Sequence, residues 1–171
     1  MIIIRYWTIQ TVEAWNEFSS LGYLIGSSVY AGFKNEYHWM MDQMKKRLVN
    51  YSGEYPIWVS LQEFNSLDVS GYVTGKQYVK LELEIDNQDV LVSNFSKWNE
   101  CVLNNLCFFD SEQEEYIYQF AEDEGLDKED FKKLTWERIF DPSRFGNSVL
   151  QGTTGKVDTD KVKNVEYFVA R

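Results

Sequence analysis

The stretch QYVKLELEI, residues 77–85, constrains the fold more than any other part of the sequence. Apolar residues at every odd position from Val79 to Ile85 alternate with charged residues at every even position from Lys80 to Glu84. Successive side chains of a strand point to opposite faces of a sheet. The alternation therefore predicts a strand with one buried face and one face that is wet or lined with charge.

Similar patterns extend along the rest of the chain. β-Branched and aromatic runs predict further strands over residues 2–7, 55–61, 90–92, 148–151 and 165–170. Cap residues and helical spacing predict helices from Thr11 to Gly22, over 30–48, from about 94 to 106, and after Ser111 and Asp127. With 171 residues and no visible linker, we expect one α+β domain over residues 1–171. Its sheet would be mixed or mostly antiparallel, with about five or six strands and four or five helices.

Most of the excess negative charge is confined to one segment. The net charge of the chain is −10, and residues 110–130 hold ten acidic residues and one lysine, a local charge of −9. Two interpretations stay open: a solvated helical face, or a docking surface for a basic protein partner. An acidic chain argues against an extended surface for duplex DNA.

The sequence also bears on location and metal chemistry. No run approaches the roughly 18 apolar residues of a membrane span, and the start MIIIRYW is closed early by Arg5, which favours a first strand over a secretory signal. Cys101 and Cys107 have no His or Cys cluster nearby, so we expect free thiols in a reducing cytoplasm. With His38 as the single histidine, we expect no metal site.

Candidate site residues are aromatic, amide and hydroxyl side chains near predicted strand ends. They are Trp7, Thr8, Gln10, Trp58, Arg138 and Gln151. Aromatic walls with a few polar groups are typical of pockets for planar ligands, so a small nucleotide is one candidate ligand. The competing interpretation is that the tryptophans only pack the core. The residues alone leave open whether the chain is an enzyme.

Several motifs in order along the chain resemble one bacterial family. These are W-T-I-Q (7–10), Y-P-I-W (55–58), L-E-L-E-I and the run from 89 to 98, W-E-R-I-F-D (136–141), and the closing V-E-Y-F-V-A-R. The family is uncharacterised, catalogued as a domain of unknown function, and its members open with W-T-I-Q. The resemblance implies a cytoplasmic bacterial or phage-derived protein and brings no activity with it.

A second similarity is to the layout of small ADP-ribosyltransferases. An aromatic–Thr step in the first strand, a helix that ends in Gly, and a late strand with Gln or Glu look like that superfamily. The resemblance implies NAD as cofactor, Trp7 and Thr8 beside the nicotinamide, and catalytic roles for Thr8 and Gln151. Three features depart from it. No histidine or arginine of the usual kind is placed, unless Arg5 serves, and GTTGK follows Gln151 where a strand is expected. An amide also lacks the carboxylate's charge for an oxocarbenium ion.

Overall fold

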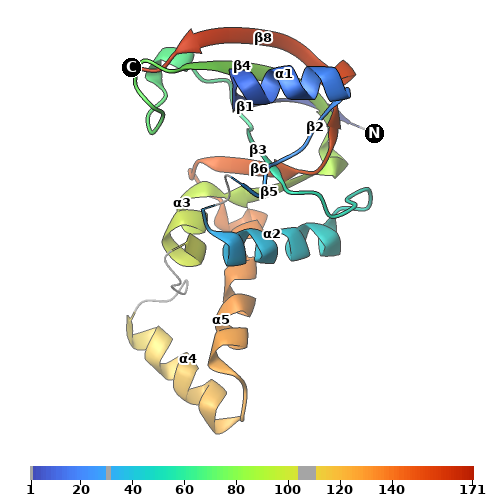
Figure 1. Ribbon diagram of the computed structural model, residues 1–171. Helices are drawn as coiled ribbons and strands as arrows, with labels where there is room; N and C mark the ends of the chain where they lie inside the picture. The colour runs from blue at the N-terminus through green and yellow to red at the C-terminus, as the bar shows by residue number, and fades with distance from the viewer. Residues whose placement is uncertain (1, 30–31, 104–110) are drawn as a thin grey trace. The chain divides into compact units, whose positions relative to one another are not determined.

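The computed structural model describes residues 2–29, 32–103 and 111–171 (Figure 1). Its contacts divide the chain into two compact units. Unit 1 comprises Met1–Leu91 with Gln151–Arg171, and unit 2 comprises Val92–Leu150. Four sequence-based expectations fall partly outside the described residues: the start of the helix at 30–31, the helix end at 104–106, Cys107 and Asp110.

A six-stranded sheet organises the fold. Its strand order is β5-β6-β3-β1-β4-β8, and β2 pairs with β7 in a separate two-stranded sheet. The recorded pairings of β1 with β3 and β4, of β3 with β6, and of β4 with β8 are all antiparallel. The strands are β1 (Ile3–Thr11), β2 (Tyr23–Leu24), β3 (Ile57–Ser60), β4 (Gln77–Asp86), β5 (Val90–Asn94), β6 (Leu150–Thr154), β7 (Val157–Asp158) and β8 (Val162–Val169). The α+β class and the mostly antiparallel sheet are confirmed.

The alternation in β4 sets the core of unit 1. Val79, Leu81 and Leu83 are fully buried and pack with Tyr6 of β1 and Val59 of β3. The opposite face of β4 is lined with charge, as the sequence predicts. There Lys80 is nevertheless 5% exposed, because its ammonium lies 3.2 Å from Glu63 Oε1 and 3.3 Å from Glu166 Oε2.

Five α-helices lie in the part of the chain that the structure describes. They are α1 (Val12–Leu21), α2 (Lys34–Arg47), α3 (Phe95–Lys97), α4 (Ser111–Asp123) and α5 (Lys128–Trp136). The short α3 continues as a π-helical turn over Trp98–Leu103. None of the described helices is long and apolar enough to cross a membrane.

The first helix begins and ends where the sequence indicates. The Thr11 hydroxyl accepts a hydrogen bond from the Ala14 amide at 3.1 Å, and Gly22 ends the helix with φ +84°. Phe18 is buried and Trp15 packs against the same core, so α1 covers the buried face of the sheet (Figure 1).

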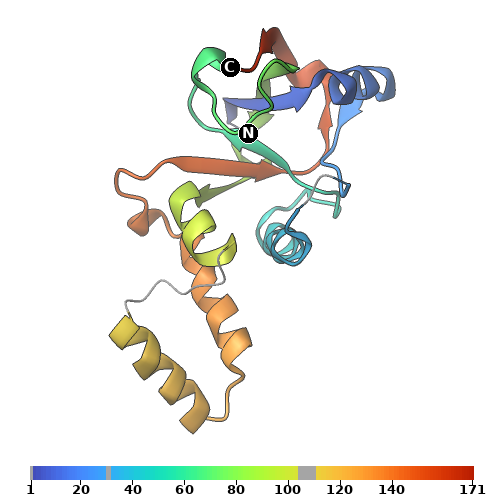
Figure 2. The ribbon, with the colours of Figure 1, turned by 60° about the vertical axis from the view of Figure 1, so that its left-hand side comes forward.

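The second helix lies on unit 1 away from α1, and Figure 2 shows it nearly end-on. Met40 and Met44 of α2 are fully buried. The Thr153 hydroxyl of β6 lies 3.7 Å from the Met40 sulfur, so the middle of α2 packs on β6.

Unit 2 contains the acidic segment. Asp127 caps α5 by accepting a hydrogen bond from the Asp130 amide at 2.9 Å, as the sequence predicts. The buried residues of unit 2 include Trp98, Val102, Trp136 and Ile139. Two aromatic residues of α4 are exposed, Tyr116 by 74% and Phe120 by 49%.

Candidate functional site

The end of β1 presents two polar side chains on one face. Thr8 and Gln10 are two residues apart in a strand, so both point to the face opposite Trp7. Thr8 is 4% exposed and Gln10 is half-buried. The Gln10 amide nitrogen donates a hydrogen bond to the Thr8 hydroxyl at 3.1 Å. Gln10 is therefore a strand residue bonded to its neighbour and takes no part in capping α1.

A pocket of about 260 Å³ opens beside this pair; we call it the Thr8 pocket. β1 pairs with β4 along its full length, whereas its recorded pairing with β3 is the single bridge between Trp7 and Ser60. Beyond that bridge the start of β3 is not paired with β1, and the pocket lies there. It is lined by Thr8, Ile9, Gln10, Gly26, Ser27, Tyr37, Pro56, Ile57, Trp58 and Tyr72.

Three aromatic residues, Tyr37, Trp58 and Tyr72, are among those that line the Thr8 pocket. The rings of Tyr37 and Trp58 meet edge to face with their centroids 5.6 Å apart, and Tyr72 packs similarly on Tyr78 at 4.9 Å. Burial raises the pKa of the Tyr37 and Tyr72 phenols, so both hydroxyls stay protonated at neutral pH. No charged side chain is found among the described residues that line the pocket.

One wall of the Thr8 pocket requires a glycine. The Gly26 amide donates to the Tyr55 carbonyl at 2.9 Å. A Cβ atom at residue 26 would lie 2.3 Å from the Pro56 carbonyl oxygen and 2.7 Å from that of Tyr55. The two backbone segments therefore approach more closely than any other residue allows.

Gln151 and Trp7 lie elsewhere on unit 1. The expectation that the segment after Gln151 departs from a strand was wrong, because Leu150–Thr154 forms β6 and Gln151 pairs with Ser60 of β3. Residues directly opposite in antiparallel strands share a face, so Trp7, Ser60 and Gln151 form a row on one face of the sheet. Neither Trp7 nor Gln151 lines the Thr8 pocket.

Two side-chain nitrogen atoms of this row lack a hydrogen-bond partner among the described residues. Trp7 Nε1 and Gln151 Nε2 are buried and have no hydrogen-bond partner in the part of the chain that the structure describes. Both atoms are donors, so an acceptor group is the chemistry that would satisfy them.

The structure thus brings three of the six predicted residues into one pocket: Thr8, Gln10 and Trp58. Arg138 belongs to unit 2, in a 3-10 turn over Glu137–Phe140. Sequence reasoning missed Tyr37, Tyr72 and Gly26. The sequence predicts a helix over 30–48 without assigning Tyr37 to a site, and no local signal links residues 26 or 72 to the end of β1.

Comparison with known proteins places this chain in a family. The family model described as "Domain of unknown function (DUF3841)" matches residues 5–163. Searches of curated proteins and of solved structures returned no match.

Proposed function

The chain belongs to the DUF3841 family, and we propose that its Thr8 pocket binds the planar ring of a nucleotide. A nucleobase is a neutral planar ring, and the nicotinamide of NAD is a planar pyridinium ring with a carboxamide and one positive charge. One observation carries the proposal: Thr8 and Gln10, which are hydrogen-bonded to each other, line the same pocket as Tyr37, Trp58 and Tyr72.

The functional groups of the pocket suit such a ring. Gln10 donates one N–H to Thr8, which leaves its second N–H and its carbonyl oxygen for a ligand amide. The faces of Trp58 and the tyrosines offer stacking surfaces, and the neutral phenols offer further donors.

The size and charge of the pocket limit what it holds. Its volume of about 260 Å³ is below the range of roughly 300–1,000 Å³ of pockets that take a whole drug-sized ligand. Because its described lining carries no charge, the phosphates of a nucleotide would remain outside it. The proposal is therefore for recognition of the ring.

An ADP-ribosyltransferase-like activity is the finer form of this proposal. Thr8 would hold the nicotinamide amide, and Gln151 would position the ribose of NAD. Gln151 is 8% exposed and does not line the Thr8 pocket. Its amide also lacks the charge that stabilises an oxocarbenium ion, so we propose a degenerate, NAD-binding relative with little or no turnover.

Calorimetric titration with NAD, nicotinamide and AMP tests the binding proposal. We expect saturable binding of at least one of them, weakened about tenfold by Gln10→Leu, a loss of about 1.4 kcal/mol. Gln77→Leu, the same change at an exposed position of β4, is the matched control and should leave binding unchanged. Failure of all three compounds to bind would overturn the proposal.

A separate assay of NAD cleavage tests the transferase form. Release of nicotinamide that is lost in Gln151→Ala, with binding retained, would support a catalytic role for Gln151. Binding without detectable cleavage is the result expected of a degenerate relative.

A second candidate function is a protein interaction through α4. Tyr116 and Phe120 are exposed on a helix whose neighbouring side chains are acidic, and exposed aromatic residues are enriched in protein interfaces. A basic segment with apolar residues is the complementary partner.

Charge reversal distinguishes this function from a merely solvated helix. Partner capture from the source cell should be lost in Glu115→Lys with Glu124→Lys, and should weaken with salt. Glu17→Lys with Asp68→Lys reverses two exposed acids of unit 1 and serves as the control. Equal capture by both variants would reject α4 as the docking surface.

A further inference from the structure

A larger cleft, of about 430 Å³, lies on unit 1 and contains none of the predicted site residues. It is formed by the segment from Leu48 to Glu54, the end of β4, and the turn from β6 into β7. Its lining carries the carboxylates of Glu54, Glu84, Asp86, Asp89 and Asp158 and the ammonium groups of Lys156 and Lys161. Five negative and two positive groups leave three net negative charges; we call this the acid-lined cleft.

The two lysines pair with groups outside the acid-lined cleft. The ammonium of Lys156 lies 5.5 Å from the ring centroid of Tyr23, and that of Lys161 lies 3.6 Å from Asp160 Oδ2. Neither Tyr23 nor Asp160 lines the cleft. Both lysines thus have contacts outside the cleft, and its lining keeps a net charge of three negative.

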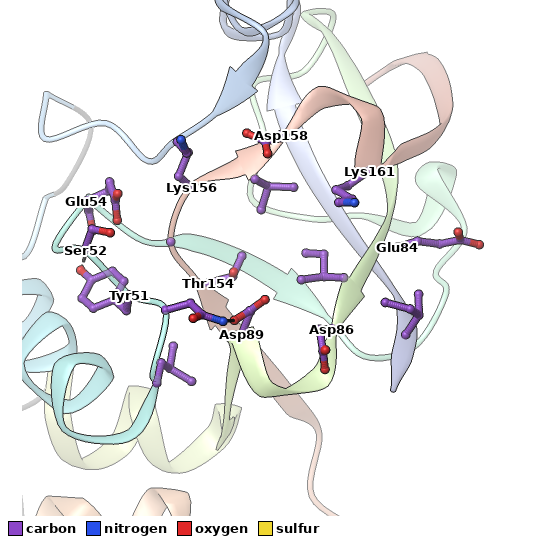
Figure 3. Close-up of a pocket in the computed structure, with 16 residues that line it drawn as sticks. Tyr51, Ser52, Glu54, Glu84, Asp86, Asp89, Thr154, Lys156, Asp158 and Lys161 are labelled. Carbon is purple, nitrogen blue, oxygen red and sulfur yellow. Dashed lines mark hydrogen bonds between the residues drawn. The ribbon is translucent and has the colours of Figure 1, made fainter. Parts of the chain in front are cut away.

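Two of the five carboxylates have no ion pair or side-chain hydrogen bond within the described part of the chain: those of Glu54 and Asp158. The others are partly engaged, because Asp89 accepts from Asn50 at 2.8 Å and Glu84 lies 3.6 Å from Arg5. Figure 3 shows Glu54 and Glu84 on opposite sides of the cleft, so the charges are spread along it.

The inner surface of the cleft is apolar with one unsatisfied hydroxyl. Leu48, Ile85 and Val157 line it and are at most 8% exposed. Thr154 is 2% exposed and is drawn among the lining residues in Figure 3. Thr153 points to α2, so Thr154 points to the other face of β6, and its hydroxyl has no recorded hydrogen bond among the described residues.

An aromatic ring stands beside the Glu54 carboxylate. A Cβ atom at Gly155 would lie 2.9 Å from Tyr51 Cδ2 and 3.1 Å from Glu54 Oε2. The Tyr51 ring and the Glu54 carboxylate therefore both lie next to this glycine. The Tyr51 hydroxyl donates to the Glu54 carbonyl at 2.5 Å, which fixes the ring. Burial and the nearby Glu54 and Asp42 raise the pKa of Tyr51 to about 12, so the phenol stays neutral. A carboxylate next to a neutral ring suits an ammonium group.

We propose that the acid-lined cleft binds an aliphatic polyamine. Its ammonium groups would pair with the Glu54 and Asp158 carboxylates, and its methylene groups would contact Leu48, Ile85 and Val157. The described residues hold no group of three or more acidic, His or Cys side chains placed to bind a metal ion. Carboxylates spread over an apolar surface match a long cation with separated charges better than a compact one.

Calorimetric titration with spermidine at 150 mM NaCl and 2 mM Mg²⁺ tests this proposal. We expect binding of one spermidine per chain, weakened at least tenfold by Glu54→Gln with Asp158→Asn. Glu115→Gln with Glu124→Gln removes two charges from exposed positions, one in α4 and one directly after it, and should change the affinity less than twofold. Thr154→Val, which keeps the charge and nearly the shape, should weaken binding several-fold, and circular dichroism checks that each variant is folded.

Three results would overturn the proposal. The first is no saturable binding of spermidine. The second is an equal loss of affinity in the α4 control, which would mean that net charge alone attracts the cation. The third is binding of spermidine in buffer without Mg²⁺ that is abolished by 2 mM Mg²⁺, which would mean that the cleft selects divalent charge rather than a long cation. All three leave the nucleotide proposal intact, because no residue lines both the Thr8 pocket and the acid-lined cleft.

Discussion

Lys80 and Glu166 show how single residues stabilise the charged face of the sheet. Lys80 on β4 and Glu166 on β8 are directly opposite each other, and Lys80 also donates to the Phe64 carbonyl at 3.0 Å. Ser66 donates to the same Glu166 carboxylate. A buried ammonium is tolerated here because each of its neighbours is an acceptor.

The stability of the fold should depend on pH through Glu166. The Ser66 hydrogen bond and then Lys80 hold the pKa of Glu166 below its ordinary value near 4.5. Because the folded-state pKa is depressed, the stabilisation is complete above the unfolded value and is lost as the pH falls through the folded value. We expect urea denaturation between pH 6 and 3 to show a smaller loss of stability in Ser66→Ala than in the parent. An unchanged pH profile would contradict this role of Ser66.

At Gly26 the prediction concerns close packing. Gly26→Ala should lower the free energy of unfolding by about 2 kcal/mol, because the new Cβ meets backbone oxygens that cannot move independently. Gly32→Ala is the control, since no atom of the described residues lies within 4 Å of a Cβ at that position, and its cost should stay within about 0.5 kcal/mol. Thermal unfolding followed by circular dichroism measures both; equal melting temperatures would refute the steric argument.

Among the elements, α1 begins at the hydrogen bond of its cap residue Thr11, and its packing on the core sets its position on the sheet. Thr11 is both the last residue of β1 and the cap of α1, so strand and helix meet without a loop. The apolar residues that follow then pack on the sheet.

Removing this cap should destabilise the strand–helix junction. Thr11→Ala should cost about 1 kcal/mol, because the Ala14 amide loses its acceptor, whereas Thr11→Ser should be nearly neutral because it keeps the hydroxyl. Chemical denaturation of the three proteins measures the difference. A similar cost for both substitutions would show that the Thr11 methyl group matters more than the hydrogen bond.

For the whole molecule, the question is whether two compact units behave as the single domain that the sequence predicts. The chain passes between the units at residues 91–92 and 150–151, and these points lie inside β5 and β6. Unfolding of either unit would therefore break a strand that the other unit uses.

We accordingly expect one cooperative transition in differential scanning calorimetry, with equal calorimetric and van't Hoff enthalpies. Trp136→Ala, in unit 2, and Leu81→Ala, in unit 1, should lower the same transition, because both remove a buried side chain. Two transitions, each sensitive to one substitution, would show that the units are separate domains.

Elements with a strong local pattern could be read from the sequence. Alternation in β4, the cap and glycine of α1, and the cap of α5 depend on residues within a few positions of each other. β2 and β7, at two residues each, carry no pattern long enough to detect. The residues after Gln151 are small and polar, so the sequence predicted that the strand ends at 151, whereas β6 continues to Thr154.

The sequence by itself therefore determined the fold class, most helices and strands, the family, and the polar character of the end of β1. Tertiary structure alone decided which of these residues meet. It brought Tyr37 and Tyr72 to Thr8, set Gln151 in a row with Trp7, and gathered the acid-lined cleft from segments more than 100 residues apart. The physical reason is that strand order and helix packing follow from burial of the whole core, whereas sequence patterns report only the neighbours along the chain.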